Sequence, residues 1–223
     1  MNKQKTAALA LAALALGASQ AASARGENFP DSYIGISGGG GDQNLEVGGA
    51  SSGKVSGTSY GAEGRLAFGK AFVADASYEQ YKGSQNGTDV DADRMEAALG
   101  FMVSVGGGGN SSLLLEGLYT GSKLKPGGAD YSKHGFGIKT GFVVPVGEHF
   151  ITSGIVELAH IQASGGQDSQ GLASFIASAG YKITRNWGIH AVYRRDAYEG
   201  RSESPGQVKF YATAYRGMIS YSF

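Results

Sequence analysis

The stretch that decides the fold is "YATAYRGMISYSF", residues 211–223. Its large apolar residues stand at odd positions, namely Tyr211, Tyr215, Ile219, Tyr221 and Phe223, and polar residues stand between them, namely Arg216, Ser220 and Ser222. Alternation of this kind predicts a β-strand with one apolar and one polar face. Strands of soluble proteins usually have about five or six residues. A strand this long needs something other than a small protein core to cover its apolar face.

The other end of the chain predicts export. Residues 1–24 read "MNKQKTAALALAALALGASQAASA". Lys3 and Lys5 precede an apolar run at Ala7–Leu16, and the small residues Ala22 to Ala24 are typical of a cleavage site. The apolar run is too short and too rich in alanine for a membrane-spanning helix. We therefore predict a signal peptide at residues 1–24 and one domain at residues 25–223.

Composition excludes several classes of protein. The chain has no cysteine, so a disulfide framework and thiol catalysis are excluded. Removal of Lys3 and Lys5 takes the formal net charge from zero to about minus two, which gives no reason to expect a nucleic-acid partner. No later stretch approaches the roughly 20 apolar residues of a transmembrane helix. Glycine is abundant, with 38 of 223 residues, and strands that curve or approach closely use it.

Period-two alternation predicts ten strands. Their ranges are Tyr33–Asp42, Gly57–Gly69, Ala71–Tyr81, Asp91–Val105, Ser112–Ser122, Lys133–Val144, Phe150–Ile161, Leu172–Ile183, Trp187–Tyr198 and Phe210–Phe223. Long connections such as "QNLEVGGASSGKVS" alternate with short ones such as "TRN". This rhythm is typical of an all-β, closed, antiparallel transmembrane β-barrel with meander topology, five long surface loops and four periplasmic turns. Eight strands are the alternative.

The two faces of the predicted strands differ in chemistry. Aromatic residues fall near both ends of the apolar faces, with Tyr60, Tyr78, Tyr119, Phe136, Tyr193 and Tyr211 on the loop side and Phe68, Phe72, Phe142, Phe150, Tyr181, Trp187 and Phe223 on the turn side. Two aromatic belts around an apolar band suit a barrel in lipid. Because lipid offers no hydrogen bonds, the last strand must pair with the first.

The opposite faces carry charge and predict a polar network inside the barrel. Its members are Glu63, Arg65, Asp75, Glu79, Arg94, Glu96, Glu116, Lys139, Glu157, His190, Arg194 and Arg216. Acids and bases are nearly equal in number, so they can neutralise one another as hydrogen-bonded ion pairs in a narrow lumen.

The signal peptide, the ten alternating segments, the "YKITRNWGIHAVYRR" hairpin and the terminal "YSF" together resemble the small outer-membrane β-barrel family, which includes OmpA-like and opacity-like barrels. The resemblance implies a place in the outer membrane of a Gram-negative bacterium, in contact with lipid and lipopolysaccharide. It also implies that Tyr221 and Phe223 act as the signal by which the outer-membrane assembly machinery recognises the chain.

Catalytic patterns are weak. Lipid A deacylases of this membrane use a histidine with a serine two residues later, so that the base can activate the hydroxyl. The histidines here are His134, His149, His160 and His190, and the residues at that offset are Phe136, Ile151, Gln162 and Val192. Omptin proteases carry a His-Asp couple near the rim of the barrel, and no His-Asp dipeptide is present in this sequence. We predict no enzyme activity and no cofactor.

Three further motifs each have two interpretations. Asp89, Asp91 and Asp93 could hold a hard cation, but a solvated acidic loop that runs into the fourth predicted strand is the favoured interpretation, so no metal site is predicted. The lysines Lys123, Lys125 and Lys133 fall in the third predicted loop, where they could meet lipopolysaccharide phosphates or act as solubilising charge. The glycines at 38–41 lack the setting of a phosphate loop and are predicted to form a flexible rim.

The sequence therefore predicts a monomeric outer-membrane barrel that displays its loops at the cell surface for envelope integrity, adhesion or recognition. A narrow porin-like channel for small solutes is the alternative. A hydrolase acting on lipid A or peptides is the second alternative.

Overall fold

The computed structural model describes residues 32–47, 50–69, 71–85, 88–105, 111–126, 131–163, 169–201 and 207–223. The predicted signal peptide lies outside these residues. Ten strands make up the fold: β1 (Tyr33–Val47), β2 (Ala50–Phe68), β3 (Phe72–Gln85), β4 (Thr88–Val105), β5 (Ser111–Pro126), β6 (Tyr131–Val146), β7 (Phe150–Ala163), β8 (Ser169–Lys182), β9 (Trp187–Arg201) and β10 (Gln207–Ser222). Within the described ranges, no helix is long and apolar enough to cross a membrane.

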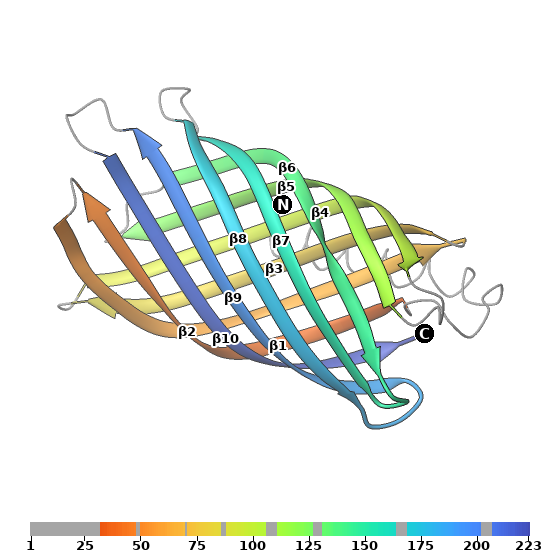
Figure 1. The fold of residues 1–223 in the computed structure, drawn as a ribbon. Coiled ribbons are helices and arrows are strands. Elements are labelled where there is room, and N and C mark those ends of the chain that lie inside the picture. Colours follow the sequence, from red (N-terminus) through yellow and green to blue (C-terminus); the bar gives the residue numbers. More distant parts are fainter. Residues whose placement is uncertain are drawn as a thin grey trace, which may run out of the picture.

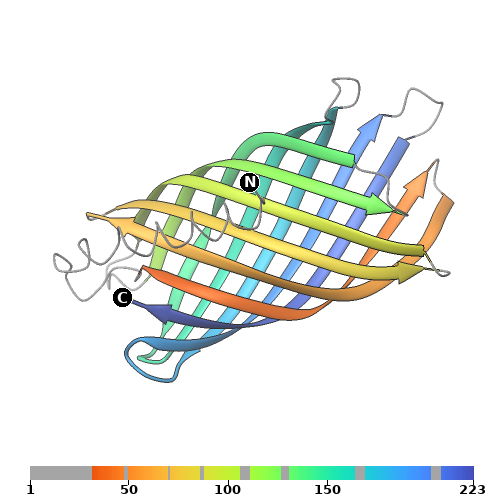
Figure 2. The same ribbon diagram turned by 180° about the vertical axis from the view of Figure 1, so that it is seen from behind.

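The strands form one closed antiparallel barrel (Figures 1 and 2). Each strand pairs with its neighbours in the sequence, and β1 also pairs with β10, where Tyr33 lies opposite Ser222. The prediction of ten strands in a closed meander is confirmed, and the alternative of eight is wrong. Closure leaves no sheet edge whose backbone groups would need another partner.

Two predicted details at the loop end are wrong. The segment after Asp42, expected to be a long loop, continues β1 to Val47, and β2 already begins at Ala50. The glycines at 38–41, expected to be a flexible rim, pair with β2 and β10 inside β1. Gly and Ser side chains show no apolar alternation, but ladder hydrogen bonds need only the backbone. The paired strands therefore extend further toward the loop end than the alternation of side chains indicates.

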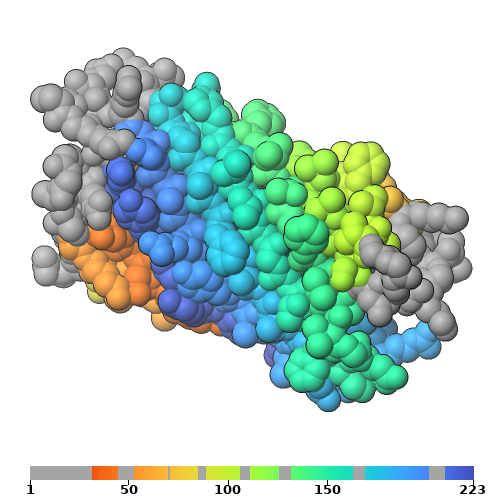
Figure 3. Space-filling model, in the orientation of Figure 1, coloured from red at the N-terminus to blue at the C-terminus, as the bar shows by residue number. Residues whose placement is uncertain are grey.

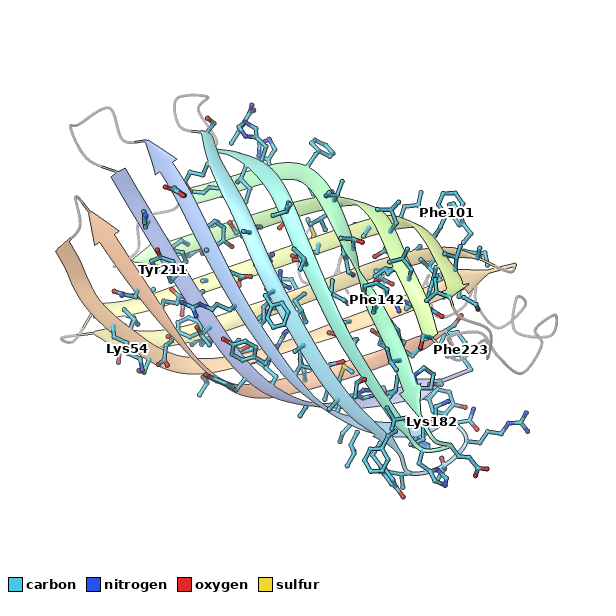
Figure 4. All side chains as sticks on the ribbon, viewed as in Figure 1. Lys54, Phe101, Phe142, Lys182, Tyr211 and Phe223 are labelled. Atoms are coloured by element: carbon cyan, nitrogen blue, oxygen red, sulfur yellow. The ribbon has the colours of Figure 1, made fainter. Side chains whose placement is uncertain are left out.

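The outer face is apolar between two groups of aromatic contacts. At the turn end, ring centroids lie 5.4 Å apart for Phe72 and Phe101 and 5.1 Å apart for Trp187 and Tyr221. Towards the loop end, contacts of 5.3 Å and 5.2 Å join two further pairs, Tyr119 with Phe136 and Tyr193 with Tyr215. Figure 4 places Phe101 and Phe223 at the turn end and Tyr211 towards the loop end. In the space-filling view the side chains of adjacent strands cover the wall as a continuous surface (Figure 3).

The inner face is layered along the barrel axis. Near the turns lies the turn-side apolar cluster, made of Ala67, Val73, Met102, Leu114, Val143 and Ile155. Nearer the loops, Ala159, Ile161 and Leu172 form a second apolar cluster with Tyr198 packed against it. Charged side chains lie between these clusters, so the middle of the lumen is the polar part of the molecule.

Candidate functional site: the charged layer of the lumen

The structure places the twelve predicted network residues on the inner face. The registers fix this, because residues opposite one another in antiparallel strands point to the same side. Arg65 lies opposite Asp75, Glu116 opposite Lys139, and Lys139 opposite Glu157. Those positions alternate with exposed apolar ones such as Leu115. The twelve residues fall into separate groups with different contacts.

The first group is the central ion cluster, made of Arg94 and Glu96 on β4, Glu157 on β7, and Arg194 and Asp196 on β9. Arg194 binds Glu96 through two hydrogen bonds, with Nη1–Oε2 at 3.0 Å and Nη2–Oε1 at 2.7 Å. Its Nε donates to Asp196 at 3.0 Å and its Nη2 to Glu157 at 2.5 Å. One guanidinium thus holds three carboxylates.

Arg94 completes the central ion cluster from the opposite wall. Its Nε donates to Glu96 at 2.7 Å, its Nη1 donates to Asp196, and its Nη2 lies 3.3 Å from Glu157. In the ring of ten strands, β4 and β9 are five strands apart, which is the largest separation that the barrel allows. The contacts between Arg94 and Asp196 therefore cross the full bore.

The central ion cluster is buried. The side chain of Glu157 is 0% exposed, and those of Arg94 and Arg194 are 9% and 6% exposed. Desolvated charges are expensive unless paired, and charge-assisted bonds are correspondingly strong in the absence of water. The cluster therefore joins opposite walls of the lumen and occupies part of its bore.

The second group is the Asp75 cluster, made of Arg65, Asp75, Glu116 and Lys139. The Arg65 guanidinium donates two hydrogen bonds to Asp75, at 2.7 Å from Nε and at 2.6 Å from Nη2. Lys139 donates a third hydrogen bond to Asp75 at 2.6 Å. Glu116 differs, because its nearest cation is Lys139 at 3.4 Å and neither of its buried oxygens has a hydrogen bond. This carboxylate is held by charge alone.

Smaller contacts account for the remaining predicted members. Arg216 Nη1 lies 3.1 Å from Glu79, which also accepts a bond of 2.7 Å from Ser59. Tyr33 donates its hydroxyl to Glu63 at 2.9 Å. The contact between Arg216 and Glu79 joins β10 to β3, two strands that are not neighbours in the barrel. It is a second link across the lumen.

His190 on β9 has a serine partner that no search by sequence offset could find. Its Nε2 lies 2.9 Å from the hydroxyl oxygen of Ser220 on β10. A nucleophilic serine also needs the histidine to be oriented by a third group at its other ring nitrogen. Among the residues that the structure describes, no carboxylate makes that bond. The geometry is that of a polar pair in the wall.

Sequence reasoning missed Asp196, a seventh acid of the inner face. It occupies the same parity as His190 and Arg194 along β9, so continued alternation could have found it. The predicted strand Trp187–Tyr198 already contains Asp196. The structure extends β9 to Arg201, past that predicted end.

Two cavities flank the charged layer. The turn-side cavity has a volume of ≈ 750 Å³ and includes Glu63, His190 and Ser220 in its wall. The loop-side cavity has a volume of ≈ 420 Å³. Arg94 and Arg194 line both cavities. The central ion cluster is thus the partition between them.

The other predicted motifs lie in strands. Asp89, Asp91 and Asp93 belong to β4, and Asp93 accepts a hydrogen bond of 3.2 Å from Tyr78. The predicted strand began at Asp91, so the expected loop is wrong only for Asp89, which β4 already includes. Across the described ranges, no group of three His, Cys, Asp or Glu residues is arranged to hold a metal ion.

The lysines of the third predicted loop are also in strands. Lys123 and Lys125 belong to β5, and Lys133 belongs to β6. Lys133 donates to Gln170 on β8 at 2.6 Å, on the inner side of the intervening strand β7 at the loop end. The expectation of a loop is wrong for Lys123 and Lys125, because β5 continues to Pro126, whereas Lys133 lies where the predicted strand begins.

Comparison with known proteins gives a fold relationship only. No family model matches the chain, and no curated protein matches it. The outer membrane protease OmpT from Escherichia coli is similar in structure, with a TM-score of 0.59, 11% identity, and coverage of 86% of this chain and 97% of that one. The chain shares the fold of an outer-membrane barrel. At this identity the likeness concerns the fold and not the protease activity.

Two further solved structures match with lower scores. The translocator domain of autotransporter NalP from Neisseria meningitidis has a TM-score of 0.48 and 12% identity, and the match covers 99% of this chain and 98% of that one. Neisserial surface protein A has a TM-score of 0.46 and 12% identity, with coverage of 86% and 97%.

Proposed function

We propose that this barrel is an integral outer-membrane protein of the cell surface, without enzyme activity or cofactor, whose closed lumen supports a loop end used in envelope integrity, adhesion or recognition. The observation that carries the proposal is the pairing of Arg194 with Glu96 and of Arg94 with Asp196 across the bore. A lumen closed by buried ion pairs leaves the loop end as the part available for partners.

The outer surface supports placement in a membrane. Side chains as apolar as Leu99 and Leu115 are each 55% exposed on the outer face. The strands have 14 to 19 residues, whereas about 9–11 tilted residues cross the hydrocarbon core. The excess length raises the loop end above the lipid, where it meets the lipopolysaccharide layer.

Three partner assignments belong to the proposal. Lipid and lipopolysaccharide surround the apolar face, the barrel acts as a monomer, and the assembly machinery recognises Tyr221 and Phe223. The ring of Tyr221 lies 5.1 Å from that of Trp187 on the outer face, and the backbone of Phe223 donates to Ser32 at 3.1 Å. Tyr221 also lies opposite Ile34 of β1, so both residues lie where the last strand meets the first.

Deletion of Phe223 tests the assembly role. We expect less folded, heat-modifiable protein in outer-membrane fractions, because the terminal aromatic side chain is lost. Phe223→Tyr keeps an aromatic ring and is the matched control, so its yield should stay near that of the unaltered protein. Equal yields from the deletion and the control would remove Tyr221 and Phe223 from the proposal.

A narrow channel is the second candidate, because cavities of ≈ 750 and ≈ 420 Å³ lie on the two sides of the central ion cluster. Single-channel recording of the refolded barrel in a planar bilayer distinguishes the two functions. A closed lumen predicts no current steps from protein that passes a heat-modifiability check. Discrete, reproducible steps from the unaltered protein would support the channel and contradict the closed lumen.

A further inference from the structure

The loop-side cavity has the size and the wall of a small-molecule site. Its volume of ≈ 420 Å³ lies within the range of about 300–1,000 Å³ that is usual for ligand pockets. Aromatic and aliphatic residues form much of the wall, among them Tyr81 on β3, Leu124 on β5, Tyr198 on β9 and Phe210 on β10. In Figure 4 the labelled Lys54 and Tyr211 mark this end of the barrel.

Small residues create the space. Ala92 on β4 and both Ala212 and Ala214 on β10 line the cavity, where larger side chains would fill it. Gly83 lets Tyr81 lie along the wall, because a Cβ at position 83 would come within 2.7 Å of the tyrosine hydroxyl. That hydroxyl donates to the Val55 carbonyl at 2.9 Å and so fixes the ring. The wall is held in place before any ligand arrives.

The floor of the cavity offers no spare charge. Arg94 and Arg194 line it, and each guanidinium is already bonded to several carboxylates of the central ion cluster. Asp196 accepts one bond on each oxygen, from Arg194 and from Arg94. An ion at this floor would lose its hydration without gaining an unpaired opposite charge from the central ion cluster. The floor therefore favours an uncharged guest.

One polar side chain in the wall is unused. Gln43 on β1 lines the cavity and is only 8% exposed. Within the described part of the chain, its carboxamide has no hydrogen-bonding partner. A carboxamide has two donor hydrogens and an accepting oxygen, and a buried amide gains free energy when a partner arrives. Gln43 is thus positioned to orient a guest molecule.

We propose that the loop-side cavity binds a small uncharged molecule with a ring-containing apolar body and one hydroxyl, carbonyl or amide group. The apolar body packs on Tyr81, Tyr198 and Phe210, since aromatic faces favour offset or edge contacts with rings. The polar group pairs with Gln43. This inference goes beyond the proposed surface role, and it does not require the lumen to conduct.

Photolabelling of the refolded barrel in lipid nanodiscs tests the site, with 4-hydroxybenzophenone as an uncharged, hydrogen-bonding probe. We expect saturable labelling of inward residues at the loop ends of β1, β3, β4 and β10, with competition by excess phenol. Labels confined to outward-facing positions would mean that the probe enters from the lipid only, and would overturn the proposal.

Ala92→Phe fills the cavity, and Ala97→Phe adds the same side chain to the outer face of the same strand, β4. The first change should abolish the inward label, and the second should leave it intact. If Ala92→Phe does not fold, Ala212→Leu takes its place. Persistence of the inward label in a folded cavity-filling variant would contradict binding in the cavity.

Gln43→Leu tests the polar contact. We expect labelling by 4-hydroxybenzophenone to need roughly three to ten times more probe, which corresponds to loss of one hydrogen bond. Labelling by 3-trifluoromethyl-3-phenyldiazirine, which lacks a hydroxyl or a carbonyl, should not weaken. An equal response of the two probes would show that Gln43 does not select the polar group.

Discussion

The central ion cluster and the Asp75 cluster lie in the same lumen but are satisfied to different degrees. In the central ion cluster, each of the three carboxylates accepts at least one hydrogen bond from a guanidinium. In the Asp75 cluster, Asp75 accepts two hydrogen bonds from the Arg65 guanidinium and one from the Lys139 ammonium, while Glu116 accepts none. Burial is similar in both, so the number of donors makes the difference.

The difference follows from the cations. An arginine has five donors in a planar fork and can hold several carboxylates at once, whereas a lysine is a compact charge on a flexible stem. Two arginines serve the central ion cluster. In the Asp75 cluster Arg65 is occupied by Asp75, and Lys139 lies 2.6 Å from Asp75 but 3.4 Å from Glu116. Glu116 is therefore a charge without bonds.

Arg194→Ala should have the largest effect on this comparison. Three buried carboxylates would be left with Arg94 as their only guanidinium, and breaking a buried ion cluster in this way costs about 3–5 kcal/mol. The free energy of unfolding, from urea titration in lipid vesicles, measures the loss. Arg195→Ala, at the next position on the outer face, is the control and should change stability by less than about 1 kcal/mol.

The Arg194→Ala variant also tests whether the central ion cluster blocks ion conduction through the lumen. Where Arg194→Ala refolds, we expect current steps in the planar bilayer, since the layer between the two cavities is thinned. A folded Arg194→Ala variant with unchanged stability and no conductance would show that the central ion cluster is not what closes the bore.

Lys139→Met should have an intermediate effect. Asp75 keeps both bonds from Arg65, but Glu116 loses its nearest cation, for a cost of about 2–3 kcal/mol. The double variant Lys139→Met, Glu116→Leu should regain most of that loss, because the uncompensated charge is removed with its partner. Additive losses in the double-mutant cycle would mean that the two side chains are not coupled.

Glu116→Gln should have the smallest effect, less than about 1 kcal/mol, because it removes a buried charge that accepts no hydrogen bond. Glu96→Gln is the matched change in the central ion cluster, and it should cost about 1.5–3 kcal/mol because it weakens charge-assisted bonds to both arginines. The same urea titration compares the two. Equal losses in the free energy of unfolding would contradict the difference in hydrogen bonding between the two clusters.

Parity along the strands was enough to predict the class of fold and the inward side of most strands. The turn ends were also close, since β7 and β9 begin at the predicted residues, Phe150 and Trp187. These features depend on local alternation and on tight turns, both of which are written in neighbouring residues.

The partners across the bore could not be predicted from the sequence. Arg94 meets Asp196 because of the tilt and stagger of ten strands, and no pattern within β4 or β9 encodes that offset. The loop-end extensions were missed for a different reason. Segments rich in Gly and Ser, such as the one after Asp42, form ladders through the backbone with little side-chain pattern to reveal them.

The seam between β1 and β10 has a consequence for the order of folding. It pairs Tyr33 with Ser222, the longest sequence separation in the sheet, so it carries the greatest loop-closure entropy and joins after the hairpins. At Gly39 a Cβ would lie 1.9 Å from the Tyr215 carbonyl oxygen, so the two backbones meet where only glycine fits. A larger residue at position 39 should therefore hinder the pairing of β1 with β10, which closes the sheet into a barrel.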